Sequence, residues 1–223
     1  GSVWSRLGSN VTVIEYLDRI TPGLDKEVSS TFQKILSKQG LTFSLNTEVI
    51  SITEEESNVI INTKNRDNSE EEEILADYAL VSTGRKPYID NLFDDDIEIE
   101  MTNNGFIKTD THLRTSVNNI WAIGDVVEGP MLAHKAEEEG IAVAELIAGK
   151  PGHVNYDIIP SVIYTNPEVA SVGMTEEQLK EKSVDYLVGK FPFLANGRAK
   201  VNNTTDGFVK ILSSADTDQI LGI

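Results

Sequence analysis

The chain of 223 residues is 39% hydrophobic and 25% charged, which is typical of a globular protein with one large domain or two smaller ones. Its formal net charge of −17 argues against partners such as nucleic acid or an anionic membrane surface, because clustered Lys and Arg bind phosphates. No run approaches the roughly 18 apolar residues of a membrane span, and the lack of Cys excludes a disulfide, a thiolate metal site or a thiol nucleophile within these residues.

Both ends of the sequence have the pattern of interrupted elements. Residues 1–8, GSVWSRLG, are typical of the second half of a helix that closes on a glycine. Residues 219–223, QILGI, form an apolar run typical of a strand. We therefore expect the sequence to be part of a longer protein, and its composition fits the cytoplasm or the mitochondrial matrix.

The first third of the sequence predicts a strand, a helix and a series of short strands. The strand at 10–15, NVTVIE, is β-branched and ends in Glu15. Residues 25–40 carry apolar side chains at helical spacing and end at a glycine. Further strands are expected at 41–45, 49–53, 59–63, 74–75 and, as a buried strand, at 78–84. This order favours a parallel α/β sheet that carries a small antiparallel β-meander.

Two acidic runs, at 54–56 and 70–73, flank the predicted hairpin. Such runs can bind a metal ion, but like charges in sequence usually repel one another and stay solvated. We therefore predict a solvated hairpin end and no metal site.

The middle of the sequence combines loops with a strand and a helix. Residues 85–120 are rich in loop signals, with a turn at 103–105, NNG. The apolar run that follows predicts a short strand that ends in Gly-Asp at Asp125. A helix is expected from Pro130 to about Gly149, and its first residues, PMLAH, include none of the usual capping side chains. Residues 149–152, GKPG, are the best candidate for a linker.

Beyond this linker the pattern indicates an α+β unit. Strands are expected at 161–164, 169–172, 186–193 and 208–212. A helix at 175–182 begins with the capping box Thr175-x-x-Gln178.

Three predicted strands end in features that a nucleotide site uses. Ligands of open parallel sheets bind at the carboxyl ends of the strands. Glu15 and Asp125 could there accept hydrogen bonds from a ribose diol or a sugar-alcohol chain, and Gly84 would let a flat ligand approach closely. The uncapped helix start at 131–134 presents N–H groups to an anion or an electron-rich atom. Each feature alone is also common at ordinary strand and helix ends, so the combination carries the prediction.

Several stretches of the sequence resemble one enzyme family. "AIGDVVEGPMLAHKAEEEG" resembles the second flavin-binding motif of the flavin-dependent pyridine nucleotide-disulfide oxidoreductases, and within them the dihydrolipoamide dehydrogenase branch. Four further stretches are similar to that branch: "GSVWSRLGSNVTVIE", "ADYALVSTGRKPY", "PSVIYTNPEVASVGMTEEQLKE" and "GKFPFLANGRAK". They occur in the same order and cover essentially the whole chain.

The resemblance implies an NAD site. Glu15 would bind the adenosine ribose of NAD at the end of its strand. Val49 would contact the adenine through its backbone, and Gly84 would lie against the cofactor.

The resemblance also implies an FAD site. Asp125 would hydrogen-bond the ribitol chain of FAD. Met131, Leu132, Ala133 and His134 would direct main-chain N–H groups at the flavin and stabilise negative charge on the reduced ring.

The same resemblance implies a domain order. Residues 1–84 would be an N-terminally truncated, Rossmann-like NAD-binding domain with the β-meander, and 85–152 a central segment with the second FAD motif. Residues 153–223 would begin the α+β interface domain that forms a homodimer. The family's Gly-rich NAD fingerprint, redox-active Cys pair and C-terminal His-Glu pair are not in this sequence, so no residue is assigned a catalytic role.

The family's reaction passes electrons from dihydrolipoamide to the Cys pair, then to FAD and then to NAD, within 2-oxo acid dehydrogenase complexes. Two alternatives stay open. One is another disulfide reductase of the family, such as a glutathione or mercuric reductase, although Glu15 favours NAD over NADP. The other is a non-catalytic module for dinucleotide binding or dimerisation.

Overall fold

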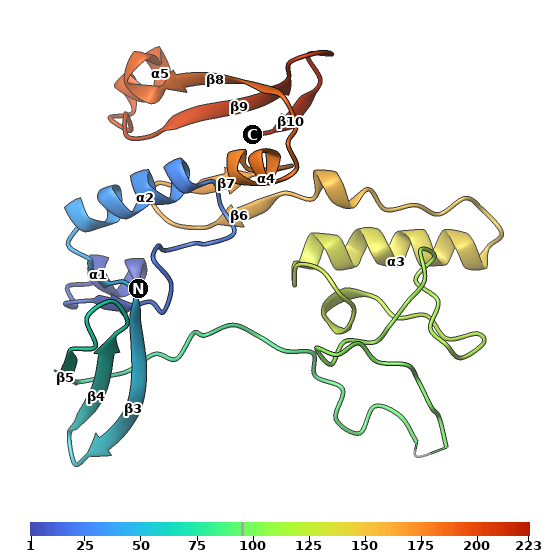
Figure 1. Cartoon of the computed structure of the whole chain (residues 1–223), viewed down its shortest axis with the longest axis horizontal. Coiled ribbons are helices and arrows are strands. Elements are labelled where there is room, and N and C mark those ends of the chain that lie inside the picture. Colours follow the sequence, from blue (N-terminus) through green and yellow to red (C-terminus); the bar gives the residue numbers. More distant parts are fainter. Residues whose placement is uncertain (95) are drawn as a thin grey trace. The chain divides into compact units, whose positions relative to one another are not determined.

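The computed structural model describes residues 1–94 and 96–223. The chain forms two compact units, one made of Gly1–Leu80 with Pro160–Ile223 and the other of Val81–Ile159. Figure 1 shows the helices and strands of both units. The predicted mixed α/β class is confirmed, whereas the domain boundaries expected after residues 84 and 152 stay predictions.

The helices and strands of the first unit follow one another along two stretches of chain. The N-terminal stretch contains α1 (Ser2–Arg6), β1 (Thr12–Ile14), α2 (Lys26–Lys38), β2 (Thr42–Ser44), β3 (Thr47–Glu55), β4 (Asn58–Asn65) and β5 (Glu71–Ala76). The C-terminal stretch contains β6 (Ser161–Ile163), β7 (Val169–Ser171), α4 (Glu176–Glu181), β8 (Tyr186–Pro192), the 3-10 turn η3 (Phe193–Ala195), α5 (Gly197–Val201), β9 (Phe208–Ser214) and β10 (Ile220–Gly222).

A parallel strand pair and an amphipathic helix form the core of the first unit. β1 and β2 pair in parallel, with Val13 opposite Phe43. Helix α2 contributes Phe32 and Leu36, which are buried in the same cluster. The Asp25 carboxylate accepts a hydrogen bond from the Glu27 N–H at 3.0 Å and caps the start of α2. The predicted parallel sheet and its helix are therefore confirmed.

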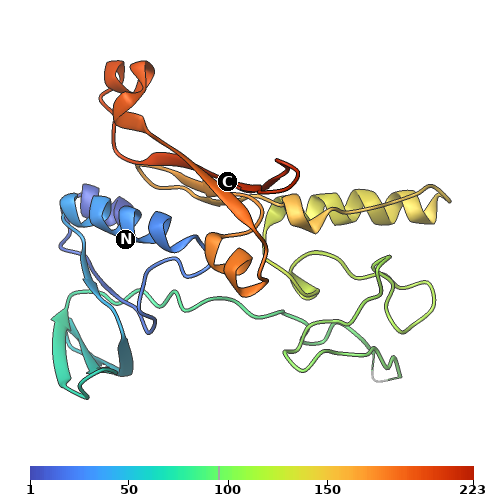
Figure 2. The same cartoon turned by 45° about the horizontal axis from the view of Figure 1, so that its top comes forward.

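The meander follows β2 directly. β3, β4 and β5 form a three-stranded antiparallel sheet, as the alternation of the sequence predicts. Figure 2 shows this sheet as a separate twisted ribbon.

The buried strand predicted at 78–84 is wrong. The structure has no strand there in the residues it describes, and Tyr78, Leu80 and Val81 are 91%, 75% and 67% exposed. A buried strand gains its stability from hydrogen-bonded neighbours and from a covered face. The apolar pattern is present, but the described residues supply no neighbouring strand for it.

The C-terminal stretch of the first unit is the predicted α+β arrangement. β8, β9 and β10 form an antiparallel sheet, β6 pairs with β7, and α5 lies at one end of the β8–β9 ribbon (Figures 1 and 2). Thr175 and Gln178 form the reciprocal capping box expected at the start of α4. The short helix α5 was not predicted, because the local sequence carries no helical period long enough to show it.

The second unit is mostly irregular chain around one long helix. It contains the 3-10 turn η1 (Gly124–Val126), helix α3 (Ala133–Ile147) and the 3-10 turn η2 (Tyr156–Ile158). A small core forms around Ile107, Ala122 and Val127. The turn predicted at 103–105 is confirmed, with Gly105 N–H donating to the Thr102 carbonyl at 3.0 Å.

One expectation for this unit needs correction. The strand predicted from the apolar run before Asp125 makes only a single bridge, between Trp121 and Arg114, among the described residues, because no continuous neighbour runs beside it. The linker expected at 149–152 stays a prediction; its Gly152 lies close to α3, since a Cβ placed there would be 2.1 Å from the Ala142 carbonyl oxygen. None of the described helices is long and apolar enough to cross a membrane.

Candidate functional site

Asp125 lies where the apolar run turns toward α3. It sits in η1, directly after Gly124, which is buried and has a φ of 76°. A glycine adopts this left-handed conformation at little cost, whereas other residues rarely do. The Asp125 side chain is 48% exposed, so hydroxyl groups of a ligand can reach its carboxylate.

The start of α3 follows a few residues later. Its N-cap position is Leu132, and in this described part of the chain no side chain caps the helix. Ala136 N–H makes the first helical hydrogen bond, to the Leu132 carbonyl at 3.2 Å, while Leu132 N–H donates to the Pro130 carbonyl. The predicted uncapped start is therefore confirmed at Ala133. The positive end of the helix dipole lies at this point.

Arg85 connects Asp125 with the start of α3, although the sequence analysis did not identify it as a site residue. Its Nη1 donates to the Asp125 Oδ2 at 3.0 Å, and its Nη2 donates to the Met131 carbonyl oxygen. Arg85 directly follows Gly84, which has a φ of 110°. The signal was present in the sequence, since Arg85 lies within the stretch "STGRKPY" beside a predicted site glycine.

This arrangement brings Gly84, Asp125 and Met131 into one neighbourhood within the second unit. An exposed carboxylate beside a helix N-terminus can accept hydrogen bonds from a polyol and face an electron-rich ring atom. The Arg85–Asp125 pair is itself well exposed, with side chains 61% and 48% accessible, and such pairs contribute little to stability. Arg85 therefore links Asp125 to the start of α3 through an exposed contact.

Glu15 occupies the predicted strand end in the first unit. Its N–H donates to the Ser44 carbonyl at 2.9 Å, and its own carbonyl accepts from Thr47 N–H at 3.0 Å. One carboxylate oxygen accepts from Leu17 N–H at 2.9 Å. The carboxylate thus lies at the carboxyl end of a parallel strand, as expected of a ribose-binding acid.

The predicted partner Val49 lies close in sequence to this strand end. The first residue of β3, Thr47, donates a hydrogen bond to Glu15 and lies two residues before Val49. Val49 is 41% exposed, and the register of β3 shifts between Val49 and Ser51. A register shift re-aims the backbone, so main-chain atoms there can meet a ligand.

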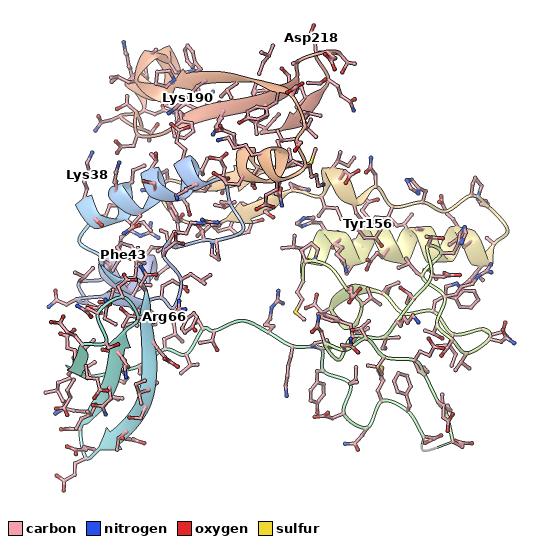
Figure 3. The ribbon with its side chains drawn as sticks, viewed as in Figure 1. Lys38, Phe43, Arg66, Tyr156, Lys190 and Asp218 are labelled. Atoms are coloured by element: carbon pink, nitrogen blue, oxygen red, sulfur yellow. The ribbon has the colours of Figure 1, made fainter. Side chains whose placement is uncertain are left out.

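A cation that the sequence did not indicate contacts Tyr16, the residue after Glu15. The Arg66 guanidinium carbon stacks 3.9 Å from the centroid of the Tyr16 ring, and Arg66 Nη1 donates to the Tyr16 carbonyl at 3.1 Å. Figure 3 shows Arg66 at the end of the meander where β3 begins. No local pattern could have shown this pair, because the two residues lie 50 positions apart.

The sequence of the chain matches two models of one protein family. The sequence model described as pyridine nucleotide-disulphide oxidoreductase matches residues 1–140, more than half of the chain. The chain belongs to this family. The family's dimerisation domain matches residues 159–223.

Individual relatives agree with this membership. "Dihydrolipoyl dehydrogenase 3" of Pseudomonas putida is 52% identical over 223 residues, which are 100% of this chain and 48% of that protein. "Dihydrolipoyl dehydrogenase, mitochondrial" of Sus scrofa is 51% identical over 224 residues, covering 100% of this chain and 44% of that protein. The chain thus spans about half the length of the curated relatives it matches.

Solved structures of the family have the same fold. The HOCl-induced flavoprotein disulfide reductase RclA from Escherichia coli superposes with a TM-score of 0.87 at 30% identity, covering 99% of this chain and 50% of that one. The resemblance inferred from the sequence motifs is confirmed. Membership of this family implies FAD together with a pyridine nucleotide, while the expected choice of NAD over NADP stays a prediction.

Proposed function

We propose that this chain is part of a dihydrolipoamide dehydrogenase, which oxidises dihydrolipoamide through a disulfide and FAD and reduces NAD. The observation that carries the proposal is the identity of about one residue in two with named dihydrolipoyl dehydrogenases over the full chain. The exposed Asp125 beside an uncapped helix supports it, because these groups suit a flavin with a polyol chain.

FAD supplies a two-electron relay between a dithiol and a pyridine nucleotide. Toward it, Asp125 accepts hydrogen bonds from the ribitol hydroxyls. The main-chain N–H groups at Met131, Leu132, Ala133 and His134 would be directed at the flavin, where the dipole of α3 would stabilise negative charge. The Leu132 N–H, which donates to the Pro130 carbonyl, would exchange that bond on binding. Arg85 hydrogen-bonds both the Asp125 carboxylate and the Met131 carbonyl and so keeps the two groups close together.

Toward NAD, Glu15 accepts hydrogen bonds from the hydroxyls of the adenosine ribose. Val49 contacts the adenine through its main chain, at the register shift of β3. Gly84 lies against the cofactor, where its positive φ excludes most other residues.

The partner of this chain is a second copy of the same protein. The match of residues 159–223 to the family's dimerisation domain supports a homodimer through the C-terminal region. Apolar side chains exposed on β8 and β9 agree with this, among them Leu187, Phe191 and Ile211. The dimer acts with the other components of 2-oxo acid dehydrogenase complexes, in the mitochondrial matrix or the cytoplasm.

The full-length protein that contains this chain tests the proposal. We expect the purified protein to show the absorption spectrum of bound flavin and to reduce NAD with dihydrolipoamide. Reduction of glutathione disulfide with NADPH, without activity on dihydrolipoamide, would instead assign the chain to another disulfide reductase branch. A protein that carries no flavin would contradict the proposal altogether.

Asp125→Ala in that protein tests the flavin contact. We expect FAD binding to weaken by about 1–3 kcal/mol, since the hydroxyl donors of the ligand lose a charged acceptor. Glu128→Ala is a matched control, because Glu128 is an exposed acid in the same loop. The measurement is the flavin content after gel filtration, and equal retention by both variants would remove Asp125 from the site.

A further inference from the structure

A buried ion pair lies on the inner face of α3. Lys135 and Glu139 are four residues apart, and both have no accessible surface. The Lys135 Nζ lies 3.0 Å from the Glu139 Oε1 and 3.3 Å from its Oε2. Taking two charges out of water is costly, so an ion pair in this position needs further hydrogen bonds to be tolerated.

Those hydrogen bonds go to the backbone of Gly124. The Gly124 N–H donates to the Glu139 Oε2 at 2.6 Å, and the Lys135 Nζ donates to the Gly124 carbonyl oxygen at 3.0 Å. One glycine thus has both of its main-chain polar groups held by a single helix face. Gly124 immediately precedes Asp125, so the pair holds the residue on which the orientation of Asp125 depends.

Packing around the pair leaves little freedom. A Cβ placed at Gly124 would lie 3.3 Å from the Ala136 Cβ, and one at Gly129 would lie 2.9 Å from the Lys135 Cε. The η1 turn therefore lies tightly on α3, and the stem of Lys135 passes directly under the loop that follows it. Both positions also have positive φ, which favours glycine there.

Tyr156 also forms a hydrogen bond with the pair. Its hydroxyl donates to the Glu139 Oε1 at 2.9 Å, and Figure 3 shows Tyr156 beside α3. Burial and the hydrogen bond to Glu139 raise the pKa of the Tyr156 hydroxyl to about 12. The hydroxyl therefore remains protonated at neutral pH and stays a donor to the carboxylate.

We propose that Lys135 and Glu139 are positioning residues, which fix the Gly124–Asp125 turn so that the Asp125 carboxylate meets the polyol chain of the flavin. This role rests on the proposed function. The ion pair does not touch the ligand; it acts through the backbone of Gly124. A buried pair of this kind is weak evidence for stability, whereas it imposes one geometry on the groups that it binds.

Two variants of the full-length protein separate positioning from stability. Lys135→Met leaves Glu139 as an unpaired buried charge, so both stability and flavin affinity should fall. The double variant Lys135→Met with Glu139→Leu removes both charges, and an apolar pair of similar volume commonly restores stability. Lys135→Met loses the hydrogen bond to the Gly124 carbonyl but keeps the one from the Gly124 N–H to Glu139, whereas the double variant loses both. Flavin affinity should therefore remain low in the double variant.

The readouts are urea unfolding of the apoprotein and the FAD dissociation constant from fluorescence titration. We expect the double variant to unfold near the wild-type midpoint and to bind FAD about tenfold more weakly, as loss of roughly 1.4 kcal/mol implies. The visible circular dichroism of bound flavin should also change, because the polyol chain is held differently. Wild-type affinity and dichroism in a stable double variant would overturn the proposal.

Lys210→Met provides the matched control. Lys210 is a buried lysine in the first unit, with its Nζ 3.0 Å from the Asp25 Oδ2 and 2.5 Å from the Glu176 Oε2. This variant should lower stability without changing the FAD dissociation constant. An equal loss of FAD affinity in Lys210→Met would show that any destabilisation has this effect, and would also overturn the positioning role.

The outcome is separable from that of the proposed function. If the wild-type protein binds no FAD, the proposed function fails before the ion pair is tested. If Asp125→Ala loses FAD while the double variant retains it, the flavin contact stands and the positioning role is wrong.

Discussion

Two acidic side chains, Glu15 and Asp125, carry the proposed cofactor contacts of this chain. Glu15 offers one carboxylate oxygen to the Leu17 N–H, and Asp125 pairs with Arg85. Both acids are accessible to solvent, so each can exchange its present partner for a ligand hydroxyl. Arg66 stacks on Tyr16, the neighbour of Glu15 in sequence, and we expect its charge together with that of Glu15 to bear on the choice of nucleotide.

Glu15→Ala in the full-length protein tests that balance. We expect NAD binding to weaken about tenfold, since a charged hydrogen-bond acceptor for the ribose is lost. The ratio of kcat/KM for NADP over NAD should rise, because a 2′-phosphate would no longer face a carboxylate and would meet Arg66 instead.

Asp18→Ala is the control for that change, as it removes an exposed acid three residues further along without altering the strand end. If Glu15→Ala leaves the ratio of the two cofactors unchanged, the ribose assignment of Glu15 is wrong.

Among the elements, α2, α4 and β9 are tied together by charge. Lys210 of β9 donates to Asp25 at the start of α2 and to Glu176 at the start of α4. Burial alone would lower the pKa of Lys210, but the hydrogen bonds to Glu176 and Asp25 outweigh it and raise that pKa. Hydrogen bonds from Lys180, Lys210 and Tyr186 lower the pKa of Glu176 to about 2.

The lowered pKa of Glu176 predicts acid-sensitive stability. A depressed folded pKa stabilises the protein above the ordinary value of 4.5, and this contribution is lost as the pH falls toward about 2. Glu176→Gln should lower the free energy of unfolding at pH 7 by about 1–3 kcal/mol. It should also flatten the decline of that free energy between pH 4.5 and 2.

Urea unfolding at a series of pH values measures both effects. Glu181→Gln serves as the control, since Glu181 is an exposed acid of the same helix and should leave the pH profile unchanged. A Glu176→Gln profile that parallels the wild type between pH 4.5 and 2 would contradict the stabilising role of its ionised carboxylate.

At the scale of the whole molecule, the chain carries the residues proposed to contact the cofactors but no sulfur nucleophile. It has no Cys, whereas a relay between a dithiol and a flavin needs a redox-active pair of them. Apolar side chains from Tyr78 to Val81 are also exposed, as a strand segment without its neighbours would be. The cofactor residues described above are therefore only one part of the site in the proposed enzyme.

The isolated 223-residue chain should accordingly not turn over dihydrolipoamide. The assay follows NADH absorbance after FAD, NAD and dihydrolipoamide are added to the purified chain, with the full-length protein as the positive control. Flavin-dependent formation of NADH by the chain alone would contradict the need for a Cys pair.

Local patterns in the sequence determined the elements whose physics is local. The helical spacing from Val28 to Leu36, the capping box of Thr175 and Gln178, and the alternation of the meander all depend on neighbours within a few positions. The uncapped start of α3 and the acid at the end of the apolar run were visible for the same reason. The resemblance to the family came from the five quoted stretches, which occur in the same order along the chain.

Only the tertiary structure decided which distant side chains meet. Arg85 reaches Asp125 across 40 positions, and Lys210 reaches Asp25 across 185. Lys135 and Glu139 have helical spacing, but nothing local indicates that this face is buried against Gly124. The apolar run at 78–84 predicted a strand that is not there, because a strand needs hydrogen-bonded neighbours that its own sequence cannot supply. Local sequence encodes the preference of each segment, whereas burial and pairing depend on which other segments the folded chain brings against it.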